Sequence, residues 1–187
     1  TVVDSDTVFH AITNFNLPNH KGESVSLTDF EGKYKIVNFI CAECETSVDR
    51  LNGEFAQLQL QFKNRTDLSF LTFIINSDNF DKASLASFVK SQEPGSFWFF
   101  IQTDASVAKE LALKSFLLKD FSPQKGSDYF VLLDQKNRIR GFYNGIEYVK
   151  VKELIDAVKV LKAEEFRPMK GDKNKREIVR KKTNKND

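Results

Sequence analysis

The sequence has few of the residues from which disulfide frameworks and metal sites are built. Its 187 residues include two cysteines, two histidines and one methionine. Two cysteines only three positions apart cannot form the set of cross-links typical of small secreted domains, so they indicate either one site or none. The sequence also has no run of the ~18 apolar residues that a membrane-spanning helix needs.

The residues that are present are typical of one globular domain. Hydrophobic residues make up 41% and charged residues 29% of the chain, which is ordinary for a folded protein. A chain of this length can bury a sizeable core, but it is short for two domains. The 18 phenylalanines fall mostly within apolar runs such as residues 97–100. We therefore expect them to fill a core and not to line a ligand site.

Positive charge is concentrated at the C-terminal end. Residues 166–187 carry a net charge of +6, whereas residues 1–165 carry −4. This arrangement argues against a nucleic-acid-binding domain, because such a domain carries its basic patch on the fold. The tail could bind anionic lipid headgroups or nucleic acid, but its composition is most typical of a disordered, solubilising end.

Apolar runs and turn signals predict the strands. Short, continuous apolar runs are typical of buried strands, and two later runs are joined by a turn at residues 134–137 that has hairpin chemistry. The predicted strands are residues 35–40, 68–75, 97–101, 129–133 and 138–143.

Spacings of three and four predict the helices. The clearest helix should begin at about Ser47, since Thr46 and Asp49 resemble a capping box. Asp104 can cap another helix. The apolar face of the first helix is expected to hold Val48, Leu51, Phe55, Leu58 and Phe62. The remaining helices are predicted over residues 82–90, 104–112 and 151–161.

This order of elements predicts an α/β fold. Parallel crossovers followed by an antiparallel hairpin give a mixed sheet with helices on both faces, which is the thioredoxin plan. We predict one domain over residues 10–165. The polar residues 1–13 should be loose, with 1–9 forming a lead-in segment, and 166–187 should form the basic tail.

Several segments, taken in order, resemble the Sco/SenC family of thioredoxin-like proteins. The opening from Asp6 to Gly22 contains a short strand and an asparagine-rich turn, as in that family. Residues 32–40 resemble its first core strand, 130–145 its terminal hairpin and 151–161 its last helix. The resemblance covers roughly residues 6–165. It implies a thioredoxin-like, Sco-type fold.

The family's metal site is altered in this sequence. Sco proteins carry a C-P-x-x-C-P stretch after the first strand and a histidine shortly before the hairpin, and these three side chains bind copper. Here Cys44 matches the first family cysteine and Val48 the second. Gly126, or a neighbour within residues 125–128, stands in the place of the histidine. The resemblance therefore implies a copper site that has lost two of its three ligands.

The two cysteines leave two kinds of chemistry to consider. Copper could be bound only weakly, with Cys44 and Cys41 as the candidate ligands, because too few soft ligands remain. His20 could approach from the early hairpin, but we expect His10 and His20 to be exposed polar residues. A Cys41–Cys44 thiol pair at the start of a helix would suit redox chemistry. Against this, Glu43 and Glu45 should raise the pKa of Cys44.

Two hypotheses of function remain from the sequence. The first is a Sco-like thiol-redox or assembly protein with an altered site at Cys44 and Cys41, at most a thiol–disulfide oxidoreductase. The second is a pseudo-Sco interaction module that keeps the fold but has lost metal and thiol chemistry. Peroxide reduction by Cys44 alone is a third reading, which the flanking glutamates oppose. Ser77 or Asp78, in the loop after the second strand, could face the site, but we expect this loop to be solvated and to cap the following helix.

The resemblance also implies a setting for the protein. Sco-type proteins sit outside the cytoplasmic membrane on an N-terminal anchor and assist cytochrome c oxidase assembly. By analogy, we expect a periplasmic or other extracytoplasmic location, with Thr1 following a removed leader or anchor. The expected partner is a respiratory oxidase subunit or a redox partner, and not a nucleic acid.

Overall fold

The structure is a computed structural model that describes residues 9–41, 48–75 and 81–165. The chain divides into two compact units, Thr1–Ile155 and Asp156–Asp187. The sheets and nearly all of the helices belong to the first unit. In the second unit the described residues are the last turns of a helix, where Lys159 and Asp156 form an ion pair at 3.0 Å. The predicted boundaries at residues 10 and 165 remain predictions.

The elements follow the order that the sequence predicts. The strands of the described residues are β1 Asn16–Pro18, β2 Ser24–Ser26, β3 Tyr34–Cys41, β4 Leu68–Ile75, β5 Trp98–Thr103, β6 Tyr129–Leu133 and β7 Ile139–Asn144. The helices are η1 Leu27–Phe30, α1 Val48–Gln61, α2 Lys82–Ser91, α3 Ala105–Glu110, η2 Leu111–Ser115 and α4 Tyr148–Glu165. Of these, η1 is a 3₁₀ turn and η2 is a π-helical turn that continues α3.

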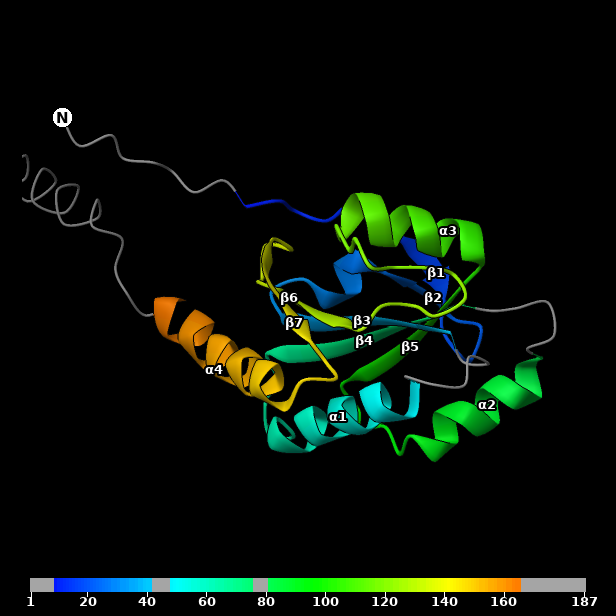
Figure 1. The fold of residues 1–187 in the computed structure, drawn as a ribbon, viewed down its shortest axis with the longest axis horizontal. Coiled ribbons are helices and arrows are strands. Elements are labelled where there is room, and N and C mark those ends of the chain that lie inside the picture. Colours follow the sequence, from blue (N-terminus) through cyan, green and yellow to red (C-terminus); the bar gives the residue numbers. More distant parts are fainter. Residues whose placement is uncertain (1–8, 42–47, 76–80, 166–187) are drawn as a thin grey trace, which may run out of the picture. The chain divides into compact units, whose positions relative to one another are not determined.

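A five-stranded mixed sheet forms the centre of the first unit, in the order β5-β4-β3-β6-β7 (Figure 1). Strands β3, β4 and β5 are parallel, while β6 and β7 form an antiparallel hairpin beside β3. Every residue of β3 and β4 is buried, because both faces of the sheet are covered. The predicted mixed sheet is therefore confirmed.

Helices pack on both faces of this sheet (Figure 1). On one face lies α1, whose Phe55 ring contacts Phe70, Trp98 and Phe130 at centroid distances of 5.0–5.4 Å. On the other face, α3 and η2 cover a cluster that includes Phe39, with Phe116 at 5.2 Å from it. Successive strand residues point to opposite faces, so each strand contributes to both cores.

The predicted helix signals are confirmed where the residues are described. Helix α1 begins at Val48, one residue after the expected start, and its Leu51, Phe55 and Leu58 are buried, as is Phe62 directly after its last residue. The carboxylate of Asp104 caps α3 by accepting from the backbone N–H groups of Ser106 and Val107. The sequence did not predict the π-helical turn η2, since its bonding pattern depends on what packs around it.

The stretch that was expected to be loose is in fact held in place from residue 9 to residue 13. The Nε2 of His10 donates to the carbonyl of Ser115 (3.0 Å), and the backbone and hydroxyl of Thr13 both bond the Ser115 hydroxyl. The Phe9 ring lies 4.4 Å from the Arg140 guanidinium. The prediction failed because these partners lie more than 100 residues away, and local polarity does not indicate them.

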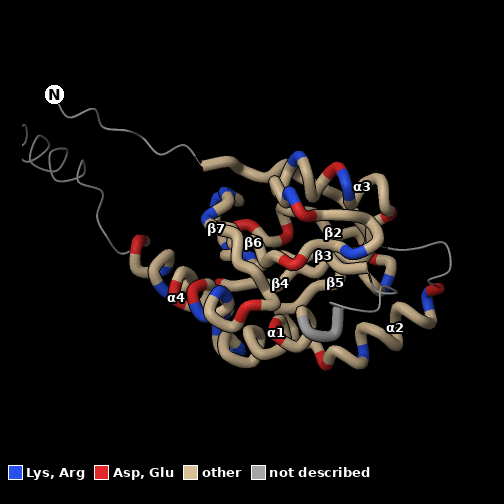
Figure 2. The backbone as a smooth tube through the Cα atoms, in the orientation of Figure 1, with Lys and Arg blue, Asp and Glu red and all other residues tan. Residues whose placement is uncertain are grey.

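Charged side chains lie mostly on the helices and loops of the first unit, while the inner strands carry few (Figure 2). Lys35 is the exception within β3, since its side chain is fully buried. Its Nζ donates to Oδ1 of Asn137 at 2.5 Å, in the turn of the β6–β7 hairpin. Among the described helices, none is long and apolar enough to cross a bilayer.

Candidate functional site at the end of strand β3

Cys41 is the last residue of the central strand β3. It lies in register with Ile75 of β4, which in turn pairs with Thr103 of β5, so the three strands end together. The Cys41 side chain is only 7% exposed and belongs to the apolar cluster around Phe39. Cys41 is disulfide-bonded. Its sulfur is therefore a buried, oxidised group at the edge of the sheet where α1 begins soon after.

The second cysteine of the predicted pair is not described. Cys44 lies in residues 42–47, outside the described residues, as do the flanking Glu43 and Glu45 and the side chain of Val48. Ser77 and Asp78, which were considered as further site residues, fall in the undescribed residues 76–80. The predicted roles of all these residues stay predictions. In sequence, Cys44 precedes the first residue of α1 by four positions, and a helix N-terminus favours a thiolate.

A loop closes against β3 immediately before Cys41. Gly126, within the loop between η2 and β6, forms a β-bridge with Ile40, and the next residue, Ser127, donates its N–H to the carbonyl of Phe39 at 3.0 Å. A Cβ atom at position 126 would lie 2.2 Å from the Phe39 carbonyl oxygen. The φ of Gly126 is +84°, where L side chains are strained. Glycine is required at position 126 because any side chain would clash with the backbone of β3.

The loop is held by a small polar network that the sequence did not point to. The hydroxyl of Ser127 donates to the carboxylate of Asp120 at 2.8 Å, and the N–H of Asp128 donates to the same carboxylate at 3.0 Å. Lys125 forms an ion pair with Asp128. The side chains around Gly126 are thus engaged with one another. Ser and Asp in a loop with glycine are too common in turns to have indicated this pairing from sequence.

Neither histidine lies near Cys41. His20 donates its backbone N–H to the carbonyl of Phe100 on β5, so it is separated from β3 by two strand spacings, or ~10 Å. The backbone carbonyl of His10 accepts from the N–H of Ile139, which lies at the opposite end of the sheet from Cys41. The expectation that both are exposed is right for His10 and wrong for His20, which is partly buried. Burial lowers the pKa of His20 below its usual value.

The side chains of the described residues around Cys41 do not fit a Cys₂His copper site. Cys41 is in a disulfide, position 126 has no room for an imidazole, and both histidines are distant. Over the part of the chain that the structure describes, no three His, Cys, Asp or Glu side chains are grouped to hold a metal ion. Of the three ligands that such a site needs, the described residues supply only Cys41 at this corner, and its sulfur is in a disulfide.

Comparisons with known proteins identify the family and the fold of the chain. The model of the redoxin family matches residues 8–161. No curated protein matches the chain at a significant level. Among solved structures, a SCO1/SenC family lipoprotein from Bacillus anthracis has 20% identity and a TM-score of 0.72, over 86% of this chain and 99% of that one.

Two further structures share the fold. BsSco, a member of the Sco family of cytochrome c oxidase assembly proteins with a disulfide switch, has 24% identity and a TM-score of 0.71, over 83% of this chain and 95% of its own. A copper-bound ScoI from Arabidopsis thaliana has 13% identity and a TM-score of 0.63, over 80% of this chain and 98% of its own. The fold is thus the thioredoxin-like fold of Sco structures, as the sequence predicted.

Proposed function

Because the chain belongs to the redoxin family, we propose that it is a Sco-like thiol–disulfide protein whose working pair is Cys41 and Cys44. One observation carries the proposal. Cys41 is disulfide-bonded at the end of β3, and the sequence holds one other cysteine, Cys44, at CxxC spacing. In a disulfide between neighbouring residues at a strand–helix junction, oxidation and reduction need little movement of the chain.

The burial of Cys41 assigns different tasks to the two sulfurs. A sulfur that is 7% exposed is hard for a partner to reach, so the partner thiolate attacks Cys44. That attack forms a mixed disulfide at Cys44 and releases Cys41 as a thiolate, which takes up a proton. The partner's second thiol then displaces Cys44, leaving both cysteines as thiols and the partner as a disulfide. Two electrons and two protons pass from the partner to this protein.

The decisive experiment traps the mixed disulfide with glutathione. Reduced Cys41→Ser protein, incubated with oxidised glutathione, should accumulate one glutathione on Cys44, because no second thiol resolves it. Wild type should give the internal disulfide with no glutathione attached. The matched variant Cys44→Ser should react at least tenfold more slowly, since its remaining thiol is buried. Equal rates of labelling in the two variants, by mass spectrometry, would contradict the assignment.

We propose further that copper delivery is not a function of this protein. The end of β3 offers one buried cysteine, Cys41, a glycine stands where the family has its histidine, and neither imidazole lies near this end of the strand. A copper(I) titration against a competing chelator should give the same weak binding for reduced wild type and for Cys44→Ser. Stoichiometric, tight binding that is lost in Cys44→Ser would refute this.

The setting is also a proposal. The similarity to a family lipoprotein and to an oxidase assembly protein supports an extracytoplasmic location, attachment through an N-terminal anchor, and a partner that is an oxidase subunit or a redox protein. The basic tail is proposed to be a disordered, solubilising end that does not bind nucleic acid. Expression of the full-length gene product with a C-terminal reporter active only outside the cytoplasm would test the location.

A second candidate function is favoured by the same burial. A disulfide with one sulfur inside the apolar cluster around Phe39 could be a structural staple in a pseudo-Sco interaction module. The two readings differ in reduction potential, because structural disulfides resist the glutathione pool whereas exchanging ones do not. A bond that opens reversibly in glutathione buffers near −200 mV supports redox function. A bond that needs potentials below about −300 mV supports the staple.

A further inference from the structure

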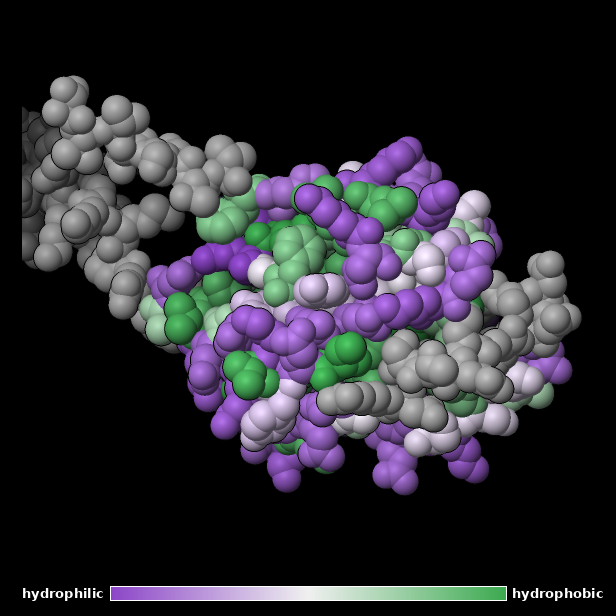
Figure 3. All heavy atoms as spheres, viewed as in Figure 1, coloured by the Kyte–Doolittle hydropathy of each residue, from purple (hydrophilic) through white to green (hydrophobic). Residues whose placement is uncertain are grey.

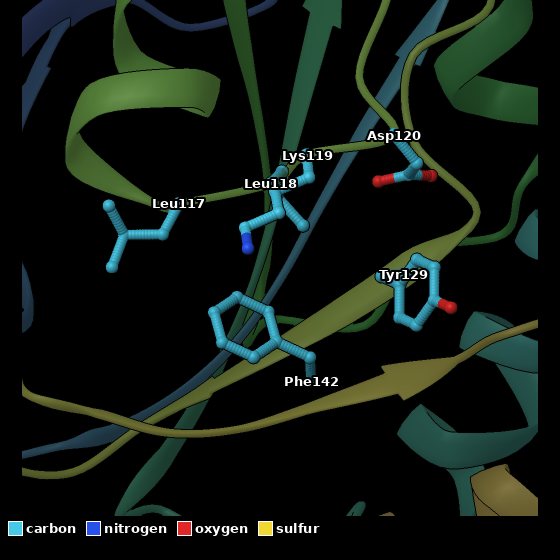
Figure 4. A pocket seen from close by; sticks show the side chains of 6 residues that line it. All are labelled: Leu117, Leu118, Lys119, Asp120, Tyr129 and Phe142. Carbon is cyan, nitrogen blue, oxygen red and sulfur yellow. The ribbon is translucent and has the colours of Figure 1, made fainter.

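Hollows lie at both edges of the five-stranded sheet. One of about 380 Å³ is drawn in Figure 4, with residues 117–120 on one side and the rings of Tyr129 and Phe142 on the other. In the space-filling view, apolar surface shows between α3 and the β6–β7 hairpin (Figure 3). The Asp120 of this hollow bonds the loop that closes on β3, so the hollow belongs to the candidate site already described. Another, the β5 hollow, has a volume of about 280 Å³ and is lined by residues that include His20, Lys21, Pro94, Trp98, Phe99 and Phe100.

Strand β5 is the edge strand at this side of the sheet (Figure 1). Its inner edge pairs with β4, where the N–H of Phe70 donates to the carbonyl of Phe97 at 2.8 Å. In a strand, successive residues direct their backbone groups to opposite edges, so Trp98 and Phe100 direct theirs outwards. An edge of this kind offers backbone groups to another chain unless they are capped.

Only half of these outward groups are capped. The N–H of Trp98 donates to the carbonyl of Gly95 at 3.2 Å, and the carbonyl of Phe100 accepts from the N–H of His20 at 3.0 Å. Within the described ranges, no group pairs with the carbonyl of Trp98 or the N–H of Phe100. Both residues are buried, at 4% and 0% exposed, and buried backbone groups without a partner are rare. Because both residues line the β5 hollow, a ligand in it can pair with this acceptor and this donor.

These two groups match the main chain of one residue in a parallel strand. Such a residue donates its N–H to the carbonyl of Trp98 and accepts at its own carbonyl from the N–H of Phe100. The added chain cannot continue past Phe100, because Asn19 bridges Ile101 there and the turn of residues 19–23 occupies the edge. A ligand chain that runs parallel to β5 therefore has to end at this residue, with its C-terminus towards the turn.

The turn supplies a positive charge at that point. Oδ1 of Asn19 accepts from the backbone N–H groups of Lys21 at 2.8 Å and Glu23 at 3.0 Å, which fixes the turn. The Glu23 carboxylate is engaged, since it accepts from Nδ2 of Asn19 at 2.8 Å. Lys21 lines the hollow, and none of the described carboxylates forms an ion pair with it. Its ammonium group is thus available to the carboxylate of a chain that ends beside the turn.

We propose that the β5 hollow binds the C-terminal residue of a peptide with an apolar side chain. The main chain of this residue pairs with Trp98 and Phe100, its carboxylate lies beside Lys21, and its side chain packs against Pro94 and Phe99. Strand addition at a sheet edge and capture of a terminal carboxylate are both established modes of peptide recognition. The site uses neither cysteine, so the proposal is independent of the thiol chemistry.

A nuclear magnetic resonance titration of the chain of residues 1–187 tests this proposal. The probe is acetyl-glycyl-glycyl-leucine with a free C-terminus. The Phe100 amide proton should move downfield and saturate, because it gains a hydrogen bond. The same peptide with an amidated C-terminus should bind about tenfold more weakly, since it lacks the negative charge. Lys21→Glu should also weaken binding of the free acid about tenfold, whereas the matched control Lys109→Glu, on the exposed surface of α3, should leave it unchanged.

Four results would overturn the proposal. One is a Phe100 amide that does not respond to the free acid up to a concentration of about 10 mM. A second is equal affinity for the acid and the amide, and a third is equal weakening by the two lysine variants, because either would remove the role of Lys21. The last is a set of shifts centred on residues 117–120, which would place the peptide in the hollow of Figure 4 instead.

Discussion

Replacing Gly126 by alanine tests the claim that the loop packs against β3 too closely for a side chain at this position. The new Cβ would lie 2.2 Å from the Phe39 carbonyl oxygen and 2.9 Å from the Ile40 Cα, and both of these are backbone atoms that cannot rotate away. The φ of +84° adds a conformational cost of ~1–2 kcal/mol. Relief of the clash costs a further ~1–3 kcal/mol. Loss of the Ser127–Phe39 hydrogen bond adds ~1 kcal/mol. The free energy of unfolding should therefore fall by about 3–6 kcal/mol.

The chain offers a matched control in Gly22. Its φ is +87°, almost the same as that of Gly126, but a Cβ there would meet no atom within 4 Å. Gly22→Ala should therefore lose only the conformational part, ~1–2 kcal/mol. Urea unfolding followed by circular dichroism gives both values. A loss for Gly126→Ala no larger than that for Gly22→Ala would show that the loop yields, and that a side chain at this position is tolerated.

Three other predictions concern single residues. Burial lowers the pKa of Lys35 to about 8 from 10.5, so the unfolded chain binds more protons than the folded chain between these pH values. The free energy of unfolding of wild type should therefore rise by about 3 kcal/mol relative to that of Lys35→Met as the pH increases through this window. Equal pH dependence of the two proteins in urea unfolding would contradict this. The side-chain amide oxygen and nitrogen of Asn52 are buried without a hydrogen-bond partner, so Asn52→Leu should stabilise the protein by about 1 kcal/mol. In contrast, Oδ1 of Asn38 accepts from the Thr72 hydroxyl at 2.7 Å, so Asn38→Leu should destabilise it. Asp104→Ala should cost about 1 kcal/mol through loss of the α3 cap, while Asp156→Ala, on an exposed helix surface, should cost little in the same assay.

The sequence predicts the elements of this fold because their signals are local. Residues 68–75 form a strand since an unbroken apolar run of that length suits a strand covered on both sides. Leu51, Phe55 and Leu58 share one face because helical periodicity places them there. The hairpin turn forms at Asp134–Asn137, where Asn137 adopts a φ of +60° that asparagine tolerates.

The features that sequence reasoning missed all depend on distant partners. The bond between His10 and Ser115 joins residues 105 positions apart, and nothing near His10 indicates it. The sequence indicates that Gly126 stands where the Sco family has a histidine. It does not indicate that the Phe39 backbone lies too close for any side chain at this position. The candidate site was predictable in part: Cys41 does end the central strand, whereas the pairing with Cys44 is still a prediction.

The single tryptophan of the chain has a practical consequence. Trp98 is 4% exposed, donates its Nε1–H to the Thr72 hydroxyl at 2.8 Å, and lies against Phe55 of α1. The tryptophan fluorescence of the protein therefore comes from a single indole packed between the sheet and α1, the helix that follows Cys44 in the sequence. An unlabelled sample thus contains its own optical probe, whose emission should shift to longer wavelength when α1 separates from the sheet and water reaches the indole.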